Sequence, residues 1–116
     1  MKIGFIGGGA MAEALTCGIL AQDVAAPEDI YISDHKQQRC DALHEMYQVQ
    51  AMVGAESFLA MVDVLFLAVK PQAALTAMQE IKAFVRDDTL LISIVSGLTI
   101  PVLEQYFTVQ PVVRVM

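Results

Sequence analysis

Three consecutive glycines follow the first apolar run of the chain. Residues 3–6 are apolar apart from one glycine, Gly7, Gly9 and Ala12 follow, and a segment of helical composition begins directly behind the glycines. Gly7 permits a tight turn out of a strand, Gly9 lets a pyrophosphate approach the backbone, and Ala12 lets a helix pack closely on the strand. The first turn of such a helix presents unpaired N–H groups and a positive dipole end to phosphate. The spacing therefore predicts a dinucleotide-binding turn.

Strand-like and helix-like segments alternate along the whole chain. Strands are predicted at 2–6, 29–33, 49–53, 63–69, 89–94 and 112–116. Helices are predicted at 10–21, 36–47, 56–61, 72–86 and 99–107. With right-handed crossovers, this alternation predicts an α/β fold with an open, doubly wound (Rossmann-type) parallel sheet in the order 3-2-1-4-5-6. Ligands of such sheets bind at the carboxyl ends of the strands, where the strand order reverses.

Two of the predicted helices carry apolar stripes at helical spacing, which predicts the faces that they bury. The stripes consist of Met11, Leu15 and Ile19 in the first helix, and of Leu75, Met78, Ile81 and Val85 in the fourth. Thr99 is predicted to cap the last helix.

The composition excludes several classes of partner. A formal charge of −6 opposes binding to nucleic acid or to an anionic membrane. The longest apolar run, residues 62–69, is much shorter than the roughly 18 residues of a membrane span. Cys17 and Cys40 are too few for a disulfide framework or a zinc site, and we expect both to be buried or half-buried free thiols. His35 and His44 have no metal-ligand spacing, so no metal site is predicted.

A polar segment, Asp34-His35-Lys36, follows the second predicted strand. An acidic residue at this place typically accepts a hydrogen bond from the adenosine ribose and favours NAD. His35, Lys36 and the nearby Arg39 instead favour the additional 2′-phosphate of NADP. Asp34 and Gln37 also have the spacing of a capping box at a helix start. Adenosine contact and helix capping both stay open.

The fourth and fifth predicted strands end in residues suited to a ligand site. Ala68 and Val69 lie where the backbone passes close to a cofactor, and Lys70 places a positive charge at the reversal point, unless it is an ordinary surface lysine. Ser96 and Gly97 would let the backbone approach a ligand, but both are also common turn residues.

Four segments taken together resemble one known family. They are Gly4 to Leu15, Leu67 to Gln72 with its Ala-Val-Lys-Pro stretch, Ser93 to Ile100, and Val112 to Met116. In order and spacing they are similar to the pyrroline-5-carboxylate reductases. The resemblance implies a cytoplasmic enzyme of proline biosynthesis that reduces 1-pyrroline-5-carboxylate to L-proline with NADPH or NADH.

The same resemblance assigns residues 1–116 to the NAD(P)-binding domain. In the family, an all-helical C-terminal half forms the dimer and supplies most substrate contacts. We therefore expect no catalytic residue in this chain, a homo-oligomeric whole protein, and cofactor binding without turnover by residues 1–116 alone. Ala10, Ala55 and Ser96-Gly97-Leu98 depart from the family pattern. The candidate cofactor-binding residues are Ile6, Gly7, Gly8, Gly9, Ala10, Met11, Asp34, His35, Lys36, Ala68, Val69, Lys70, Pro71, Ile94, Val95 and Ser96.

Two other functions are compatible with the same residues. One is another NAD(P)-dependent dehydrogenase, of the β-hydroxyacid or prephenate type, and the other is a non-catalytic module that senses a dinucleotide. The sequence stops inside an expected strand at Arg114–Met116, and the mean hydropathy of +0.55 is high. We therefore expect the front half of a longer protein, with an apolar surface that the other half covers and that drives self-association when exposed.

Overall fold

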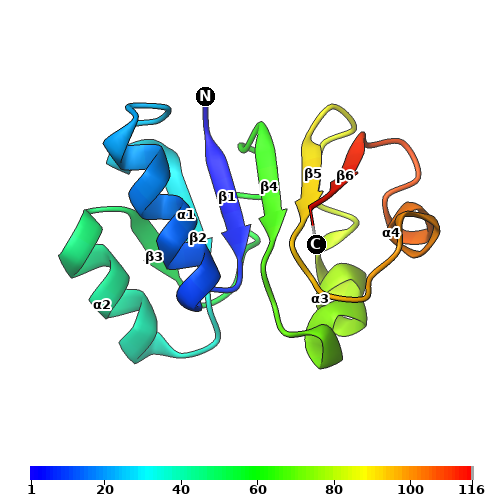
Figure 1. Cartoon of the computed structure of the whole chain (residues 1–116), viewed down its shortest axis with the longest axis horizontal. Coiled ribbons are helices and arrows are strands. Elements are labelled where there is room, and N and C mark those ends of the chain that lie inside the picture. The colour runs from blue at the N-terminus through cyan, green and yellow to red at the C-terminus, as the bar shows by residue number, and fades with distance from the viewer. Residues whose placement is uncertain (116) are drawn as a thin grey trace.

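A six-stranded parallel sheet organises the molecule (Figure 1), and the computed structural model describes residues 1–115. Its strands are β1 (Ile3–Ile6), β2 (Ile30–Ser33), β3 (Gln50–Met52), β4 (Val64–Leu67), β5 (Leu90–Ser93) and β6 (Val112–Arg114). Their order is β3-β2-β1-β4-β5-β6, and every pairing is parallel. The predicted doubly wound topology and strand order are confirmed. The part of the last predicted strand at Met116 lies outside the described residues.

Helices pack on both faces of this sheet. They are α1 (Ala10–Ala21), α2 (Gln37–Tyr47), α3 (Ala74–Ile81) and α4 (Ile100–Tyr106), with short 3-10 turns η1 (Pro27–Asp29) and η2 (Pro71–Ala73). Side chains alternate along a strand, so Phe5 and Ile6 point to opposite faces. Phe5 packs in a core cluster with residues of α1 and α2, whereas Ile6 packs in a second cluster with residues of α3 and α4. The sheet therefore separates two cores.

The register brings β1 and β4 together at the centre of the sheet. Phe5 lies opposite Ile32 of β2 and Phe66 of β4, and the Phe5 and Phe66 rings stack with centroids 4.8 Å apart. Phe66 in turn lies opposite Ile92, which lies opposite Val113. Paired residues of parallel strands point to the same face. Figure 1 shows α1 over the β1 side of this face and no helix in front of β5 and β6, and Val113 is 44% exposed.

The predicted helix at 56–61 is wrong, because this segment forms hydrogen-bonded turns. The N–H of Phe58 donates to the Ala55 carbonyl at 3.0 Å, and the N–H of Met61 donates to the Phe58 carbonyl at 2.9 Å. Both bonds span three residues, as in 3-10 turns. Phe58, Leu59 and Val62 are almost completely buried in the core cluster that contains Ile6, so tertiary packing rather than local helical preference decides the conformation here.

The predicted helix faces are partly wrong. Met11 is 48% exposed and Leu75 is 52% exposed, although both lie in predicted apolar stripes. In α1 the smaller side chains of Ala12 and Thr16 face the sheet instead, which confirms the close helix–strand packing expected from Ala12. The predicted cap of α4 is confirmed, because the Thr99 hydroxyl accepts a hydrogen bond from the Val102 N–H at 3.4 Å.

The fourth predicted helix and the thiols differ in detail. Helix α3 ends at Ile81, and the chain continues as turns at 82–84 and a bend at 85 rather than as helix. Cys40 is buried as expected, whereas Cys17 is exposed.

An aspartate connects the amino ends of the central strands. The Asp63 carboxylate accepts a hydrogen bond from the Lys2 N–H at 2.8 Å and forms a 3.1 Å ion pair with Arg86. Arg86 also pairs with Asp88 at 3.0 Å. The bond from Lys2 and then the Arg86 guanidinium lower the pKa of Asp63 below its usual value of 3.8. This interaction stabilises the fold when Asp63 is ionised.

We predict an acid-dependent stability difference at this position. Because the folded-state pKa of Asp63 is depressed, its contribution is present above pH 3.8 and is lost as the pH falls through the folded-state value. The free energy of unfolding of the wild type should therefore fall more steeply in acid than that of Asp63→Asn, as measured by urea denaturation over a pH series. Parallel acid limbs in the two proteins would contradict this role.

The turn after β1 generates a second stability prediction. Gly7 has φ +103°, and a Cβ there would lie 2.5 Å from the Ala68 carbonyl oxygen. Gly7→Ala should lower the free energy of unfolding by at least about 1–3 kcal/mol through backbone strain, before the clash is counted. Gly18, inside α1 with open space around it, is the matched control. Gly18→Ala should raise stability by about 0.5–1 kcal/mol. Equal effects of the two substitutions on the free energy of unfolding would refute the strain assigned to Gly7.

Candidate functional site

A cavity of about 810 Å³ opens at the carboxyl ends of the central strands. Its volume lies in the range of small-molecule and cofactor sites. Its walls are the glycine loop at 7–9, residues 33–36 with Arg39, residues 53–56 with Leu59, residues 68–70 after β4, and the exposed side of η2 and α3. It therefore lies at the reversal of strand order between β1 and β4, where the fold predicts a ligand.

The three glycines of the loop have different physical roles. Gly8 lies over the core, because a Cβ there would come within 3.0 Å of the Leu43 side chain on α2 and 3.3 Å of Asp34. Gly9 faces the cavity, and a Cβ there would have nothing within 4 Å. The open space at Gly9 is where a ligand can reach the backbone. Gly8 therefore allows close packing against Leu43, and Gly9 leaves room for a ligand to reach the backbone.

The start of α1 supplies hydrogen-bond donors to this space. Gly9 is its N-cap residue and carries no capping side chain. Within residues 1–115, the backbone N–H groups of Gly9, Ala10 and Met11 have no hydrogen-bond partner. Unpaired N–H groups at the positive end of a twelve-residue helix form a site for an anion. The geometry therefore fits the pyrophosphate of a dinucleotide.

Asp34 lies beside the loop, and the capping-box prediction for it is wrong. One carboxylate oxygen accepts from the Gly8 N–H at 3.0 Å and the other from the Lys36 N–H at 2.9 Å. Helix α2 begins after Lys36 without a side-chain cap, and the Gln37 amide instead donates to Asp41. Each Asp34 oxygen keeps a second acceptor position for a ligand hydroxyl. The carboxylate is therefore held at the edge of the cavity.

Arg39 connects α2 to the loop and to α1. Its Nε donates to the Gly8 carbonyl at 2.5 Å, and its Nη2 forms a 2.6 Å ion pair with Glu13. The Tyr47 hydroxyl donates to the other oxygen of Glu13. The hydrogen bonds from Tyr47 and Arg39 lower the pKa of Glu13 below its usual value. The sequence groups Arg39 with His35 and Lys36, whereas the structure pairs it with the loop.

The end of β4 approaches the glycine loop from the other side. The Ala68 N–H donates to the Ile6 carbonyl at 2.8 Å, which extends the pairing of β1 and β4 to the rim of the cavity. Lys70 follows in extended conformation before η2, and it is exposed at the cavity wall. It therefore adds a positive charge to the site without being buried.

The structure gathers most of the predicted site residues around one space. The predicted residues that line the cavity are Ile6, Gly7, Gly8, Gly9, Asp34, His35, Lys36, Ala68, Val69 and Lys70. The predicted residues outside its lining are Ala10, Met11, Pro71, Ile94, Val95 and Ser96. The backbone N–H groups of Ala10 and Met11 are among the unpaired donors at the start of α1. The Val95 side chain is buried, so any contact there is made by its backbone.

Two walls of the cavity contain none of the predicted cofactor-binding residues. Residues 53–56 follow β3, where Gly54 turns the chain at φ +85°, and Thr76, Ala77 and Glu80 face the cavity from α3. A strand end followed by a glycine is a signal that could have identified the first wall. The α3 wall has no such signal, because its contribution depends on how the helix packs.

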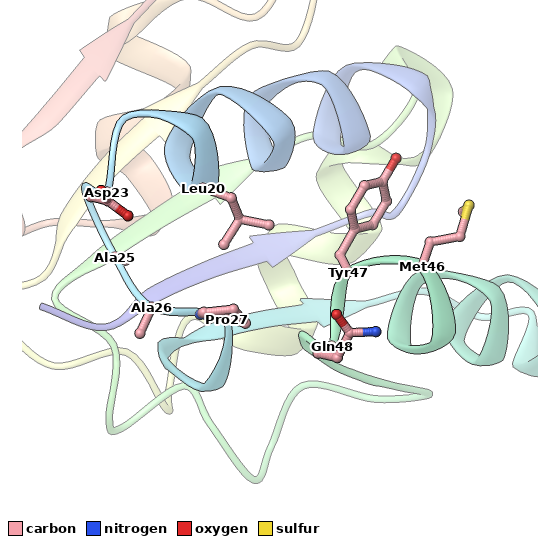
Figure 2. A pocket seen from close by; sticks show the side chains of 8 residues that line it. All are labelled: Leu20, Asp23, Ala25, Ala26, Pro27, Met46, Tyr47 and Gln48. Carbon is pink, nitrogen blue, oxygen red and sulfur yellow. The ribbon is translucent and has the colours of Figure 1, made fainter.

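A second hollow of about 530 Å³ lies toward the amino ends of the strands, away from the glycine loop (Figure 2). It is formed where α1 and α2 end, with Leu20 and Pro27 on one side and Met46 and Tyr47 on the other. Asp23 is the charged residue in its lining. The negative charge of Asp23 would repel a phosphate, so the cavity at the glycine loop is the candidate site.

Among residues 1–115, no group of three or more His, Cys, Asp or Glu side chains is arranged to hold a metal ion. No helix in the same part of the chain combines the length and apolarity that crossing a membrane requires.

Comparison with known proteins assigns the chain to a family. Residues 2–97 match the family model described as NADP oxidoreductase coenzyme F420-dependent. The chain is 38% identical to pyrroline-5-carboxylate reductase 2 of Bacillus subtilis over 117 aligned positions, which cover 99% of the chain and 42% of that protein. It superimposes on a pyrroline-5-carboxylate reductase of Coxiella burnetii with TM-score 0.91 and 29% identity, covering 99% of this chain and 43% of that one.

A third relative was solved with a ligand. The Plasmodium falciparum pyrroline carboxylate reductase with NADP bound matches at TM-score 0.73 and 29% identity, over 92% of this chain and 38% of that one. The chain thus spans about two-fifths of the length of the relatives that it matches. It belongs to the NADP oxidoreductase family described as coenzyme F420-dependent, and it is similar in sequence and in fold to the matched part of these pyrroline-5-carboxylate reductases.

Proposed function

We propose that residues 1–116 are the cofactor-binding domain of an enzyme that reduces 1-pyrroline-5-carboxylate to L-proline by hydride transfer from NADPH or NADH. One observation carries the proposal: the cavity at the strand reversal, with open space at Gly9 and unpaired N–H groups at the start of α1. The 38% identity to the Bacillus subtilis reductase favours this substrate over those of other dehydrogenases.

The positions of the cavity walls suggest which part of a bound dinucleotide each of them contacts. The pyrophosphate lies against Gly9 and the first turn of α1, where N–H groups point at the anion. The adenosine lies toward Asp34, Lys36 and the wall at 53–56. The nicotinamide lies toward Ala68–Lys70, near the end of β5 at Ile94–Ser96. Hydride donation is the chemistry of the cofactor, and this domain binds and orients it.

The remaining parts of the reaction belong to other segments of the whole protein. The family resemblance assigns most substrate contacts to a C-terminal half, so we propose that substrate contacts come from the longer protein that its relatives exemplify. We also propose a cytoplasmic homo-oligomer. The unpaired thiols of Cys17 and Cys40 suit a reducing compartment, and the apolar face at Ile92 and Val113 suits a covering domain or subunit.

A direct test compares binding with turnover. Residues 1–116 should bind NADPH or NADH in a fluorescence titration, and should show no oxidation of NADPH when 1-pyrroline-5-carboxylate is added. The full-length protein should show that oxidation. Binding without turnover by the full-length protein would instead favour a dinucleotide-sensing module.

Gly9 provides the sharpest variant for this site. Gly9→Val should fold normally, because a side chain there meets open space, and should lose measurable dinucleotide binding, because the side chain occupies the pyrophosphate position. Nicotinamide fluorescence measures the binding, and far-UV circular dichroism checks the fold. Unchanged affinity in the folded variant would remove Gly9 from the site.

Lys36 tests the preference between the two cofactors. If its exposed ammonium group binds the 2′-phosphate of NADPH, Lys36→Ala should weaken NADPH binding by about 1.5–3 kcal/mol, or roughly 10- to 100-fold. NADH lacks that phosphate, so its affinity should not change. An equal loss for both cofactors, or no loss, would show that Lys36 is only a solvated residue at the start of α2.

A further inference from the structure

Arg39 occupies an unusual place for a cation next to a nucleotide site, because its Nε and Nη2 groups donate to the protein. Besides the 2.5 Å bond from Nε to the Gly8 carbonyl, its Nη2 lies 2.6 Å from Glu13 and 3.5 Å from the Gly9 carbonyl. Its side chain is 29% exposed. The guanidinium thus contacts the loop and the first helix, which are separated from it by more than twenty residues of sequence.

The orientation of one peptide group links Arg39 to ligand binding. In a planar trans peptide, the carbonyl and the N–H point in opposite directions, and no cis peptide occurs among residues 1–115. The Gly8 carbonyl belongs to the same peptide as the Gly9 N–H. Because Arg39 binds that carbonyl, the Gly9 N–H is directed away from Arg39. It is one of the unpaired donors at the start of α1.

The neighbouring peptide is held from the same side. The Gly8 N–H donates to Asp34, so this donor of the loop is already used and leaves the pyrophosphate to Gly9 and the residues after it. Glu13 in α1 holds the guanidinium, and Tyr47 from the end of α2 holds Glu13. Without Arg39, the loop would present a carbonyl free to rotate and a carboxylate without its cation near an anionic ligand.

We propose that Arg39, anchored by Glu13, is a positioning residue that orients the Gly8–Gly9 peptide for the pyrophosphate, and that it does not bind the 2′-phosphate of NADPH. This inference rests on the proposed dinucleotide binding. It separates Arg39 from Lys36, although the two residues lie three positions apart in sequence. The pyrophosphate is common to NADPH and NADH, so loss of Arg39 must affect both cofactors alike.

The test measures both affinities in one set of variants. Arg39→Gln should weaken binding of NADPH and NADH by the same factor, roughly 10-fold or more for a lost charge-assisted contact network. Arg86→Gln is the matched control, because Arg86 also pairs with carboxylates but lies at the amino ends of the strands. It should leave both affinities unchanged. Loss of NADPH affinity alone in Arg39→Gln would overturn the proposal, as would no loss.

A double variant separates positioning from simple repulsion. In Arg39→Gln, the unpaired Glu13 carboxylate could itself repel the phosphates. Glu13→Gln combined with Arg39→Gln removes that charge without restoring the bond to Gly8. If positioning is the role of Arg39, the double variant should stay weak for both cofactors. Full recovery of affinity would show that Arg39 only neutralises Glu13, and would overturn the proposal.

Amide hydrogen exchange without ligand supplies an independent readout. The Gly8 N–H is protected by Asp34 in the wild type, and it should exchange faster in Arg39→Gln because the adjoining peptide is released. Unchanged exchange would contradict the proposal even if the wild type bound neither cofactor, a result that would refute the proposed function separately. If Arg39→Gln does not fold, Arg39→Lys replaces it, with the same equal loss expected because one ammonium cannot form the guanidinium fork.

Discussion

The approach of Gly7 to the carbonyl of Ala68 determines the geometry around which the site is built. It joins β1 to β4 at the point where the order of the sheet reverses. The N–H of Gly7 donates to Ser33 of β2 at 2.8 Å, and the N–H of Ala68 donates to Ile6 at 2.8 Å. The end of β1 is thus hydrogen-bonded on both sides, and only a glycine can leave it through this turn. The start of α1 and the mouth of the cavity follow from that exit.

Close packing behind the loop supports its backbone. Ala12 and Thr16 bring α1 close to the sheet, and the Thr16 hydroxyl donates to the Ala12 carbonyl at 2.8 Å rather than remaining unpaired in the core. Gly8 meets Leu43 of α2, which ties the second helix to the loop. Hydrogen-bond donors held in this way need little reordering when an anion binds, which favours affinity.

Features that follow from local sequence patterns and general topology rules were predicted correctly, whereas features that depend on contacts between distant parts of the chain were not. The sheet order could be predicted because alternating segments and crossover handedness leave few topologies. The helix expected at 56–61 failed because burial of Phe58, Leu59 and Val62 outweighed local helical preference. The capping box at Asp34 failed because the carboxylate found a donor in Gly8, far away in sequence. Met11 was misplaced because Ala12 and Thr16, rather than Met11, face the sheet from α1.

The amino-acid sequence by itself determined the turn after β1, the alternation of strands and helices, and the residue types at the rim of the site. These features depend on contacts between near neighbours and on the backbone freedom of glycine. Only the tertiary structure decided which partner each rim residue meets. Arg39 contacts Gly8 and Glu13 rather than open solvent, and residues 53–56 and α3 complete the cavity. Those contacts form between segments that are far apart in sequence, and only packing on the sheet brings such segments together.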